Sequence, residues 1–187
     1  MARRAETYVS VDIESDGPIP GPHSMLSLGA AAFSAEGTLH GTFSVNLERL
    51  PGAKGHPETM AWWERQPEAW EACREAPEAP ATAMPRFRAW GEALPGRPVF
   101  VAFPAGFDFM FVTWYLHRFA GGTPFGFAAL DMKSFAMAVL RRPFGECVKR
   151  NFPRTWKSSR RHTHVALDDA LEQGELFVAM LRASREP

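Results

Sequence analysis

Two acidic residues, Asp12 and Glu14, stand one residue apart in a segment that alternates apolar and polar side chains. Val9, Val11 and Ile13 fill the apolar positions, and this period of two is typical of a β-strand. Both carboxylates therefore point to the same face of the strand. Carboxylates held side by side repel one another, and a bound cation is a natural reason to place them there. The alternative is a solvated strand edge, because acidic pairs of this spacing also arise by chance.

A third acidic residue, Asp108, follows the continuous apolar segment 98–103, which predicts a buried strand. The residues after it are Phe109, Met110 and Phe111. A lone carboxylate among so many apolar side chains is costly to bury unless another group pairs with it. The alternative is that Asp108 caps the helix that follows.

His164 and Asp169 lie in the segment HVALDDA at residues 164–170. Five residues advance a helix by about 500°, which leaves two mid-helix side chains about 140° apart. Both can face one site only if His164 stands at the start of the helix and Asp169 lies one turn inside it. Asp168 then faces elsewhere. The alternative for His164 is an ordinary surface histidine at a helix start.

The elements that must position these residues follow from the hydrophobic period and the turn residues. Strands are expected at residues 8–14, 25–33, 38–47, 98–103 and 125–127. Helices are expected at residues 58–65, 67–74, 82–94, 107–119, 132–140 and 165–183. Residues 34–37 predict a hairpin connection, and residues 141–161 show no period and are interpreted as a loop. This order predicts one α/β domain over residues 1–187, with a mixed sheet flanked by helices.

Hydrophobic residues make up 45% and charged residues 22% of the 187, which is an ordinary globular composition. The formal net charge is zero, but residues 141–161 hold eight Lys or Arg against one Glu. This basic segment attracts phosphates, and its alternative is a solvated loop with no partner.

Two features bear on the compartment. Cys73 and Cys147 fit no zinc spacing, and no apolar signal segment follows the polar N-terminus, so a reduced, cytoplasmic protein is expected. The apolar stretch 99–116 contains Pro104, Gly106 and Asp108, which argue against a bilayer span. No membrane partner is expected.

At these motifs the chain resembles the DEDDh-type 3′-5′ exonucleases of the DnaQ-like superfamily, which includes proofreading subunits, ribonuclease T and oligoribonuclease. The D-x-E motif matches residues 12–14, the Phe-Asp pair matches Phe107-Asp108, and H-x-A-x-x-D-A matches residues 164–170. Val165 stands where the tyrosine class would carry Tyr. Many members carry His-Asn shortly before the second motif, where this chain reads FPAG at 103–106. The resemblance covers about residues 7–181 and implies a ribonuclease H-like fold.

The resemblance also implies a two-metal exonuclease. Two Mg²⁺ or Mn²⁺ ions, which suit hard oxygen ligands, would be held by four carboxylates: Asp12, Glu14, Asp108 and Asp169. His164 would take the proton from the attacking water. The substrate would be single-stranded DNA or RNA with a free 3′ end, cleaved to nucleoside 5′-monophosphates. Relatives of this kind are often dimers, so a homodimer is compatible with the resemblance.

Substrate contacts are expected near the motifs and in the basic segment. The basic segment contributes Arg160 and Arg161, which stand just before the third motif. Near the first two motifs the resemblance points to a further set of residues: Ile13, Ser15, Asp16, Met25 and Phe107. Exposed aromatic rings could stack on bases, and the helical core pattern leaves three unexplained: Trp62, Trp63 and Trp156.

Two other functions stay open. A catalytically inactive nucleic-acid-binding module would keep the fold, and an exoribonuclease restricted to short RNA would keep the chemistry. The sequence does not separate DNA from RNA as the substrate, because no residue identifies a reader of the 2′-hydroxyl.

Overall fold

A computed structural model describes residues 5–185. Its strands are β1 (Glu6–Ser15), β2 (Met25–Phe33), β3 (Leu39–Asn46), β4 (Arg97–Ala102) and β5 (Ala129–Asp131). Its α-helices are α1 (Pro57–Trp63), α2 (Pro67–Arg74), α3 (Pro80–Glu92), α4 (Ala105–Ala120), α5 (Met132–Leu140) and α6 (Ala166–Ala183). Three short 3₁₀ helices lie between α5 and α6: η1 (Phe144–Glu146), η2 (Lys149–Asn151) and η3 (Arg154–Trp156).

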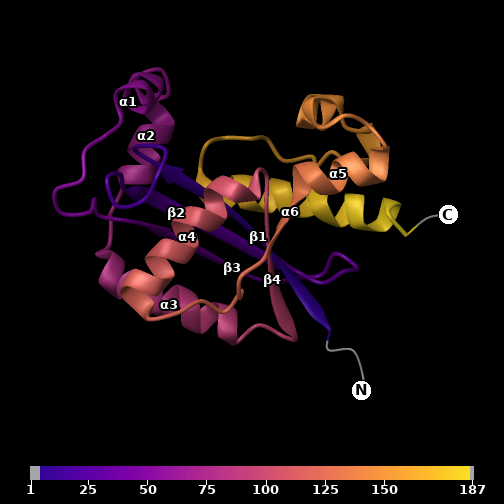
Figure 1. The fold of residues 1–187 in the computed structure, drawn as a ribbon, viewed down its shortest axis with the longest axis horizontal. Helices are drawn as coiled ribbons and strands as arrows, with labels where there is room; N and C mark the ends of the chain where they lie inside the picture. The colour runs from indigo at the N-terminus through magenta and orange to yellow at the C-terminus, as the bar shows by residue number, and fades with distance from the viewer. Residues whose placement is uncertain (1–4, 186–187) are drawn as a thin grey trace.

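The five strands form one mixed sheet in the order β3-β2-β1-β4-β5. The first three strands are antiparallel neighbours, and β1, β4 and β5 run parallel to one another. Helices cover both faces, and α6 runs across the sheet at one face (Figure 1). The sequence-based prediction of a mixed sheet flanked by helices is confirmed.

Strand β1 separates two hydrophobic cores by its alternation. Val9, Val11 and Ile13 pack in the core on the side of α3 and α4. Tyr8 points to the other side, where its ring lies 5.0 Å from that of Phe177 on α6. The residues at even positions of β1 therefore face α6, and these include both acids of the first motif.

One strand was predicted at the wrong place. Residues 125–127 form no strand; the last strand is β5, which pairs with β4 from Phe100↔Ala129 onward. Phe125 is buried against Phe87 and Phe100 from a turn, while Phe127 is fully exposed. Gly126 between them has a φ of 71°, which extended backbone does not use. The two phenylalanines therefore belong to a turn and not to a strand, and only Phe125 packs into the core.

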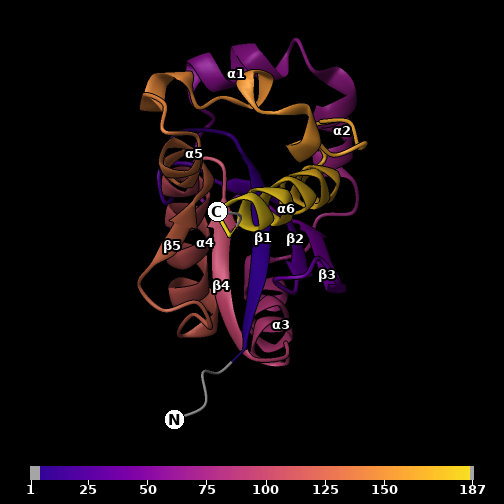
Figure 2. The same ribbon diagram turned by 90° about the vertical axis from the view of Figure 1, so that its right-hand side faces the viewer.

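The basic segment 141–161 is also more structured than predicted. It forms three 3₁₀ helices, and Cys147, Phe152 and Trp156, which follow η1, follow η2 and end η3, are buried in one cluster with residues of α5 and α6. The apolar positions follow no helical or strand period because each belongs to a separate short turn. Figure 2 shows this segment and α1 at the same end of the molecule. No helix within residues 5–185 is long and apolar enough to cross a membrane.

Candidate metal and catalytic centre

Three carboxylates from two elements meet at one end of the sheet. Asp12 and Glu14 point from β1 toward α6, and Asp169 points back from the first turn of α6. One carboxylate oxygen of each lies within 4.8 Å of the others. Asp169 is 1% exposed, so its carboxylate is shielded from solvent.

Asp108 adds a fourth carboxylate from α4. Its Oδ1 accepts a hydrogen bond from the Ile13 amide at 3.1 Å, between the two acids of β1. The alternative that Asp108 caps α4 is wrong, because Pro104 is the N-cap and Asp108 lies inside the first turn. We call Asp12, Glu14, Asp108 and Asp169 the carboxylate centre.

The backbone before α6 holds Asp169 in place. The amide of Thr163 donates to Oδ1 at 2.8 Å, and the amide of His164 donates to Oδ2 at 2.9 Å. His162 approaches the same Oδ2 through Nδ1 at 3.0 Å. A carboxylate offers about four acceptor sites, two on each oxygen, so these three contacts leave one site on Oδ1 for a cation.

Helix α6 can come this close because β2 carries a glycine opposite Asp12. Gly29 is the register partner of Asp12, and a Cβ at Gly29 would lie 2.2 Å from the carbonyl carbon and oxygen of Ala166. The start of α6 therefore rests on the bare backbone of β2. This contact brings the third motif to the first.

A buried glutamine fixes the same helix one turn further along. Gln173 is 1% exposed, and its Nε2 donates to Ser10 Oγ at 3.1 Å and to the Val11 carbonyl at 3.0 Å. Both partners are on β1. These hydrogen bonds set the position of α6 along the strand that carries Asp12 and Glu14.

Burial dominates the electrostatics of the carboxylate centre. It raises the pKa of Asp12 well above its ordinary value, and the negative charges of Asp108 and Asp169 add to this effect. It raises the pKa of Glu14 to about 9 and the pKa of Asp108 to about 8. Crowded, desolvated carboxylates resist ionisation, and a divalent cation would reverse that preference.

Asp169 differs from its neighbours. Although burial raises its pKa, the hydrogen bonds from His162 and from the Thr163 amide lower it, and its pKa lies below the ordinary value. Asp169 is therefore the member of the centre that carries its negative charge most readily.

His164 stands two residues before the first residue of α6, with a φ of 59°, in the left-handed region that few non-glycine residues adopt. The 140° separation applies only when both side chains lie within a helix. Because His164 lies in this turn before α6, its ring can face the same site as Asp169. A ring nitrogen of His164 lies within 4.8 Å of the Asp169 carboxylate and of a ring nitrogen of His162. The His164 ring also packs edge-on against the Trp62 ring of α1, with centroids 5.0 Å apart.

Burial and the neighbouring His162 lower the pKa of His164 below its ordinary value, against an opposing effect of Asp169. The neutral ring is thus favoured at pH 7, and a neutral ring can accept a proton. The half-buried position against Trp62 limits the directions the ring can take.

The donor set fits a divalent cation. Among residues 5–185, no ion pair reaches Asp12, Glu14 or Asp108. The positive charge of Lys149 lowers the pKa of Asp12, but Lys149 is itself paired with Glu172. Buried carboxylates without a basic partner are otherwise unfavourable, and oxygen-only ligands suit Mg²⁺ or Mn²⁺.

The residues expected to contact substrate lie in different surroundings. Ile13, Ser15 and Met25 are at most 6% exposed, so little of their side chains is open to a ligand. Phe107 is half-buried beside Asp108. Asp16 is fully buried, and its Oδ1 accepts from the Ser24 amide at 2.6 Å.

The two arginines before the third motif are not equivalent. Arg160 pairs through Nε with Glu175 of α6 at 2.9 Å, while Arg161 is exposed and forms no ion pair within residues 5–185. Of the unexplained tryptophans, Trp63 and Trp156 are buried and Trp62 contacts His164.

Sequence reasoning missed His162, which contacts both Asp169 and His164. Its only signal was the spacing His162-Thr163-His164, which is uninformative without knowing that the loop folds back onto the carboxylate. Sequence reasoning also missed the role of Gln173, whose position one turn after Asp169 places it on the same helical face.

Comparison with known proteins adds to this geometry. No protein-family model matches the sequence. The chain is 34% identical over 181 residues to the 3′-5′ DNA exonuclease Cap18 of Escherichia coli, an alignment that covers 95% of this chain and 92% of that protein.

Two solved structures share the fold. The nuclease domain of 3′hExo, described as a DEDDh family member bound to rAMP, superposes with a TM-score of 0.69 at 10% identity, covering 95% of this chain and 92% of that one. Pop2p of S. pombe in its Mg²⁺- and Mn²⁺-bound form has a TM-score of 0.62 at 17% identity, covering 91% and 81%.

Proposed function

The chain belongs to the DEDDh family of 3′-5′ exonucleases, and we propose that its carboxylate centre works with two divalent ions, Mg²⁺ or Mn²⁺, to hydrolyse DNA. The observation that carries this proposal is that three acids of β1 and α6 bring ligand oxygens within 4.8 Å of one another, while Asp108 of α4 accepts from the Ile13 amide between two of them. All five positions of the family's motifs are filled.

Each acid of the carboxylate centre has a proposed role. Asp12, Glu14 and Asp169 would ligate the ions, and Asp108 would complete the site while its hydrogen bond to Ile13 fixes the end of β1. Bound there, two such ions would supply electrostatic stabilisation of the charge that develops during displacement at phosphorus.

His164 would accept the proton of the attacking water. Its ring is neutral at pH 7 because its pKa is lowered, and the Trp62 ring and His162 hold it beside Asp169. Attack by that water opens the bond between phosphorus and the 3′ oxygen of the preceding nucleotide. The products are a nucleoside 5′-monophosphate and a strand shortened by one nucleotide with a new 3′-hydroxyl.

DNA is the proposed substrate because the relative at 34% identity is named a DNA exonuclease. A single strand with a free 3′ end is proposed because the relative is named a 3′-5′ exonuclease, and because the half-buried Asp12 and Glu14 leave the centre partly open to a strand end. The basic segment 141–161 would draw in the phosphates, since most of its Lys and Arg side chains are exposed.

The test is digestion of 5′-labelled single-stranded DNA and RNA oligomers with Mg²⁺, Mn²⁺ or EDTA. We expect a metal-dependent ladder that shortens from the 3′ end. Asp169→Asn removes the charge but keeps the side-chain shape, and it should abolish the ladder. Asp168→Asn, one residue away and exposed, is the matched control and should digest like the wild type.

The outcomes separate the remaining functions. Metal-independent cleavage, or full activity of Asp169→Asn, would refute the two-metal centre. Binding without cleavage would identify an inactive nucleic-acid-binding module. Digestion of short RNA with no digestion of DNA would identify an exoribonuclease. The expected homodimer stays a prediction, which light scattering can measure.

A further inference from the structure

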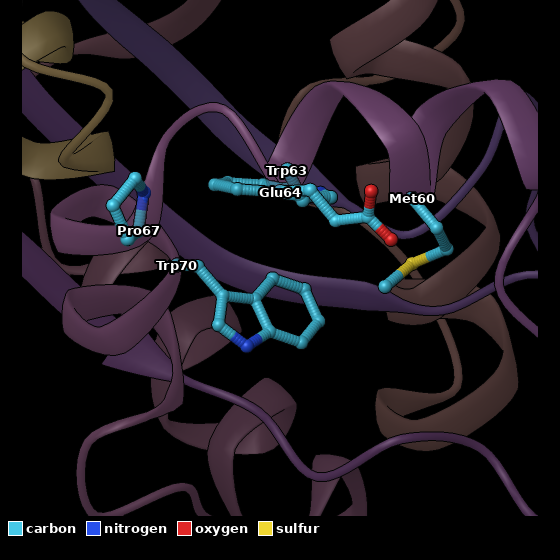
Figure 3. A pocket seen from close by; sticks show the side chains of 5 residues that line it. All are labelled: Met60, Trp63, Glu64, Pro67 and Trp70. Carbon is cyan, nitrogen blue, oxygen red and sulfur yellow. The ribbon is translucent and has the colours of Figure 1, made fainter.

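A pocket on α1 and α2 lies outside the carboxylate centre. It has a volume of about 210 Å³ and is lined by five residues: Met60, Trp63, Glu64, Pro67 and Trp70 (Figure 3). Pockets that hold drug-sized ligands measure roughly 300–1,000 Å³, so this one suits a single small ring system. Four of its five lining side chains are apolar or aromatic, which suits a flat, weakly polar group.

The pocket is connected to the catalytic histidine by a row of rings. Trp62 lies 5.0 Å from His164, Trp63 lies 4.8 Å from Trp62, and Trp70 lies 5.3 Å from Trp63, measured between ring centroids. Trp63 is anchored to the strand of the first motif, because its Nε1 donates to the Ser15 carbonyl at 2.9 Å. The row therefore has a fixed position relative to the carboxylate centre.

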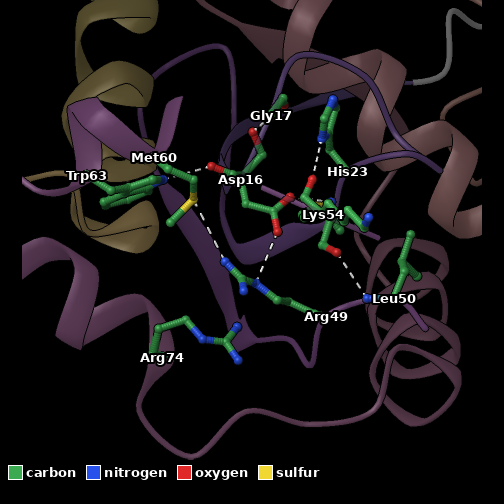
Figure 4. A network of polar contacts seen from close by, with 12 residues as sticks. Asp16, Gly17, His23, Arg49, Leu50, Lys54, Met60, Trp63 and Arg74 are labelled. Atoms are coloured by element: carbon green, nitrogen blue, oxygen red, sulfur yellow. Dashed lines mark hydrogen bonds and ion pairs between the residues drawn. The ribbon is translucent and has the colours of Figure 1, made fainter. Parts of the chain in front are cut away.

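A positive charge stands beside this pocket. The guanidinium of Arg49 lies 5.6 Å from the centroid of the Trp70 ring. Its Nη2 lies 3.8 Å from the Met60 sulfur (Figure 4). Its Nε pairs with Asp16 at 3.1 Å, and Asp16 is fully buried. This ion pair with a buried carboxylate restricts where the guanidinium of Arg49 can lie.

Arg49 is 40% exposed, so part of its guanidinium remains open to a ligand. The exposed Glu64 carboxylate would repel a phosphate from the pocket itself. A nucleotide would thus place its base in the pocket and its phosphate at Arg49. Proteins that bind single strands typically stack aromatic side chains on the bases and place basic side chains along the phosphate backbone.

We propose that the α1–α2 pocket and Arg49 form a second nucleotide subsite, which binds one base of the single strand other than the 3′-terminal base. The proposal rests on the proposed function, because the occupant is the strand whose end lies in the carboxylate centre. The subsite explains why Asp16, adjacent to the first motif, is buried: it positions Arg49 and does not touch the terminal nucleotide.

The experiment measures binding of 5′-fluorescein-labelled single-stranded DNA in EDTA by fluorescence anisotropy, with one abasic nucleotide moved along the strand. In the wild type we expect one internal abasic position to weaken binding about tenfold, in the range measured for one stacked base. Trp70→Leu keeps an apolar side chain but removes the ring. It should weaken binding of the intact strand by a similar factor and no longer respond to that abasic position.

Two control variants separate loss of the Trp70 ring from a general loss of folding. Trp90→Leu removes another half-buried tryptophan, on α3, and should leave binding and the abasic response unchanged. Trp70→Phe retains a ring and should retain most of the affinity. Melting curves of each variant check that it is folded.

A wild-type response confined to the terminal base, or an unchanged internal response in Trp70→Leu, would overturn the subsite. Digestion of the same strands with Mg²⁺ or Mn²⁺ is scored separately. Absence of digestion with an intact abasic response would refute the proposed function and leave the subsite standing as a binding site.

Discussion

At the scale of single residues, the carboxylate centre is a source of instability when no cation is bound. Glu14 and Asp108 have pKa values raised to about 9 and about 8, and the pKa of Asp12 is raised as well. Acids with raised pKa values bind protons more tightly in the folded state than in the unfolded state. Their stabilising effect is therefore complete at low pH and is lost as pH rises from about 4 toward 9.

Asp12→Asn tests this repulsion. In EDTA at pH 8 we expect the variant to melt several degrees above the wild type, since 1 kcal/mol changes Tm by about 2–4 °C in a domain of this size. Added Mg²⁺ or Mn²⁺ should raise the Tm of the wild type more than that of the variant. The measurement is thermal unfolding followed by circular dichroism at pH 5 and pH 8. A lower Tm for the variant at pH 8 would contradict the assigned repulsion.

His164→Ala tests the proton acceptor. We expect kcat/KM to fall about 10²–10⁴-fold, the usual contribution of a general base. Because the pKa of His164 is lowered, wild-type activity should fall only below a pH under the ordinary histidine value of 6.5, where the ring becomes protonated. The variant should lack that acidic limb in its pH–rate profile. His40→Ala, at an exposed position of β3, is the control and should keep the wild-type profile.

At the scale of elements, the centre depends on how closely α6 approaches β2. Gly29 provides the contact, because any Cβ there would overlap the backbone of Ala166. The neighbouring contact of α6 with Phe33 is similar, since a Cβ at Gly174 would lie 2.2 Å from the Phe33 ring. Two glycines, one on each element, thus allow the helix and the strand to pack at close range.

Gly29→Ala should push the start of α6 away from β1. We expect a loss of about 1–3 kcal/mol in the free energy of unfolding from overpacking. We also expect about a hundredfold loss of kcat, because a displacement of about 1 Å misplaces the third motif. Gly145→Ala, where the added Cβ meets no atom within 4 Å, should change neither. Urea unfolding and single-turnover digestion measure the two effects, and full activity in Gly29→Ala would refute the contact's role.

At the scale of the whole molecule, charge is segregated although the net charge is zero. The basic segment 141–161 lies next to α6, and two of its residues, Lys149 and Arg160, are paired with acids of that helix. Most of the others are exposed and available to phosphates. Binding of a strand should therefore weaken steeply with salt.

Arg161→Gln and Arg160→Gln separate free from paired charge. Each phosphate contact to a single strand contributes roughly 0.7 to the slope of log K against log salt concentration. We expect Arg161→Gln to reduce the slope by about that amount and Arg160→Gln to reduce it less, because Glu175 already neutralises Arg160. Anisotropy titrations in EDTA at several salt concentrations measure both. Equal slopes for both variants and the wild type would exclude a role for this end of the basic segment.

The sequence by itself determined much of the centre. The alternation of β1 put Asp12 and Glu14 on one face, and the helical period put Asp169 one turn into α6. These features depend on local backbone geometry, which short-range sequence patterns encode. Most strand and helix positions followed from the same periods, and the family resemblance supplied the role expected of each acid.

Only the tertiary structure decided which long-range partners meet. His162 folds back onto Asp169, Gly29 allows the close approach of α6, and Asp16 pairs with Arg49. The place of β5 and the buried turns of the basic segment were likewise set by packing against distant elements. Such contacts join residues far apart in the chain, and their energy comes from burial and hydrogen bonds that no local period records.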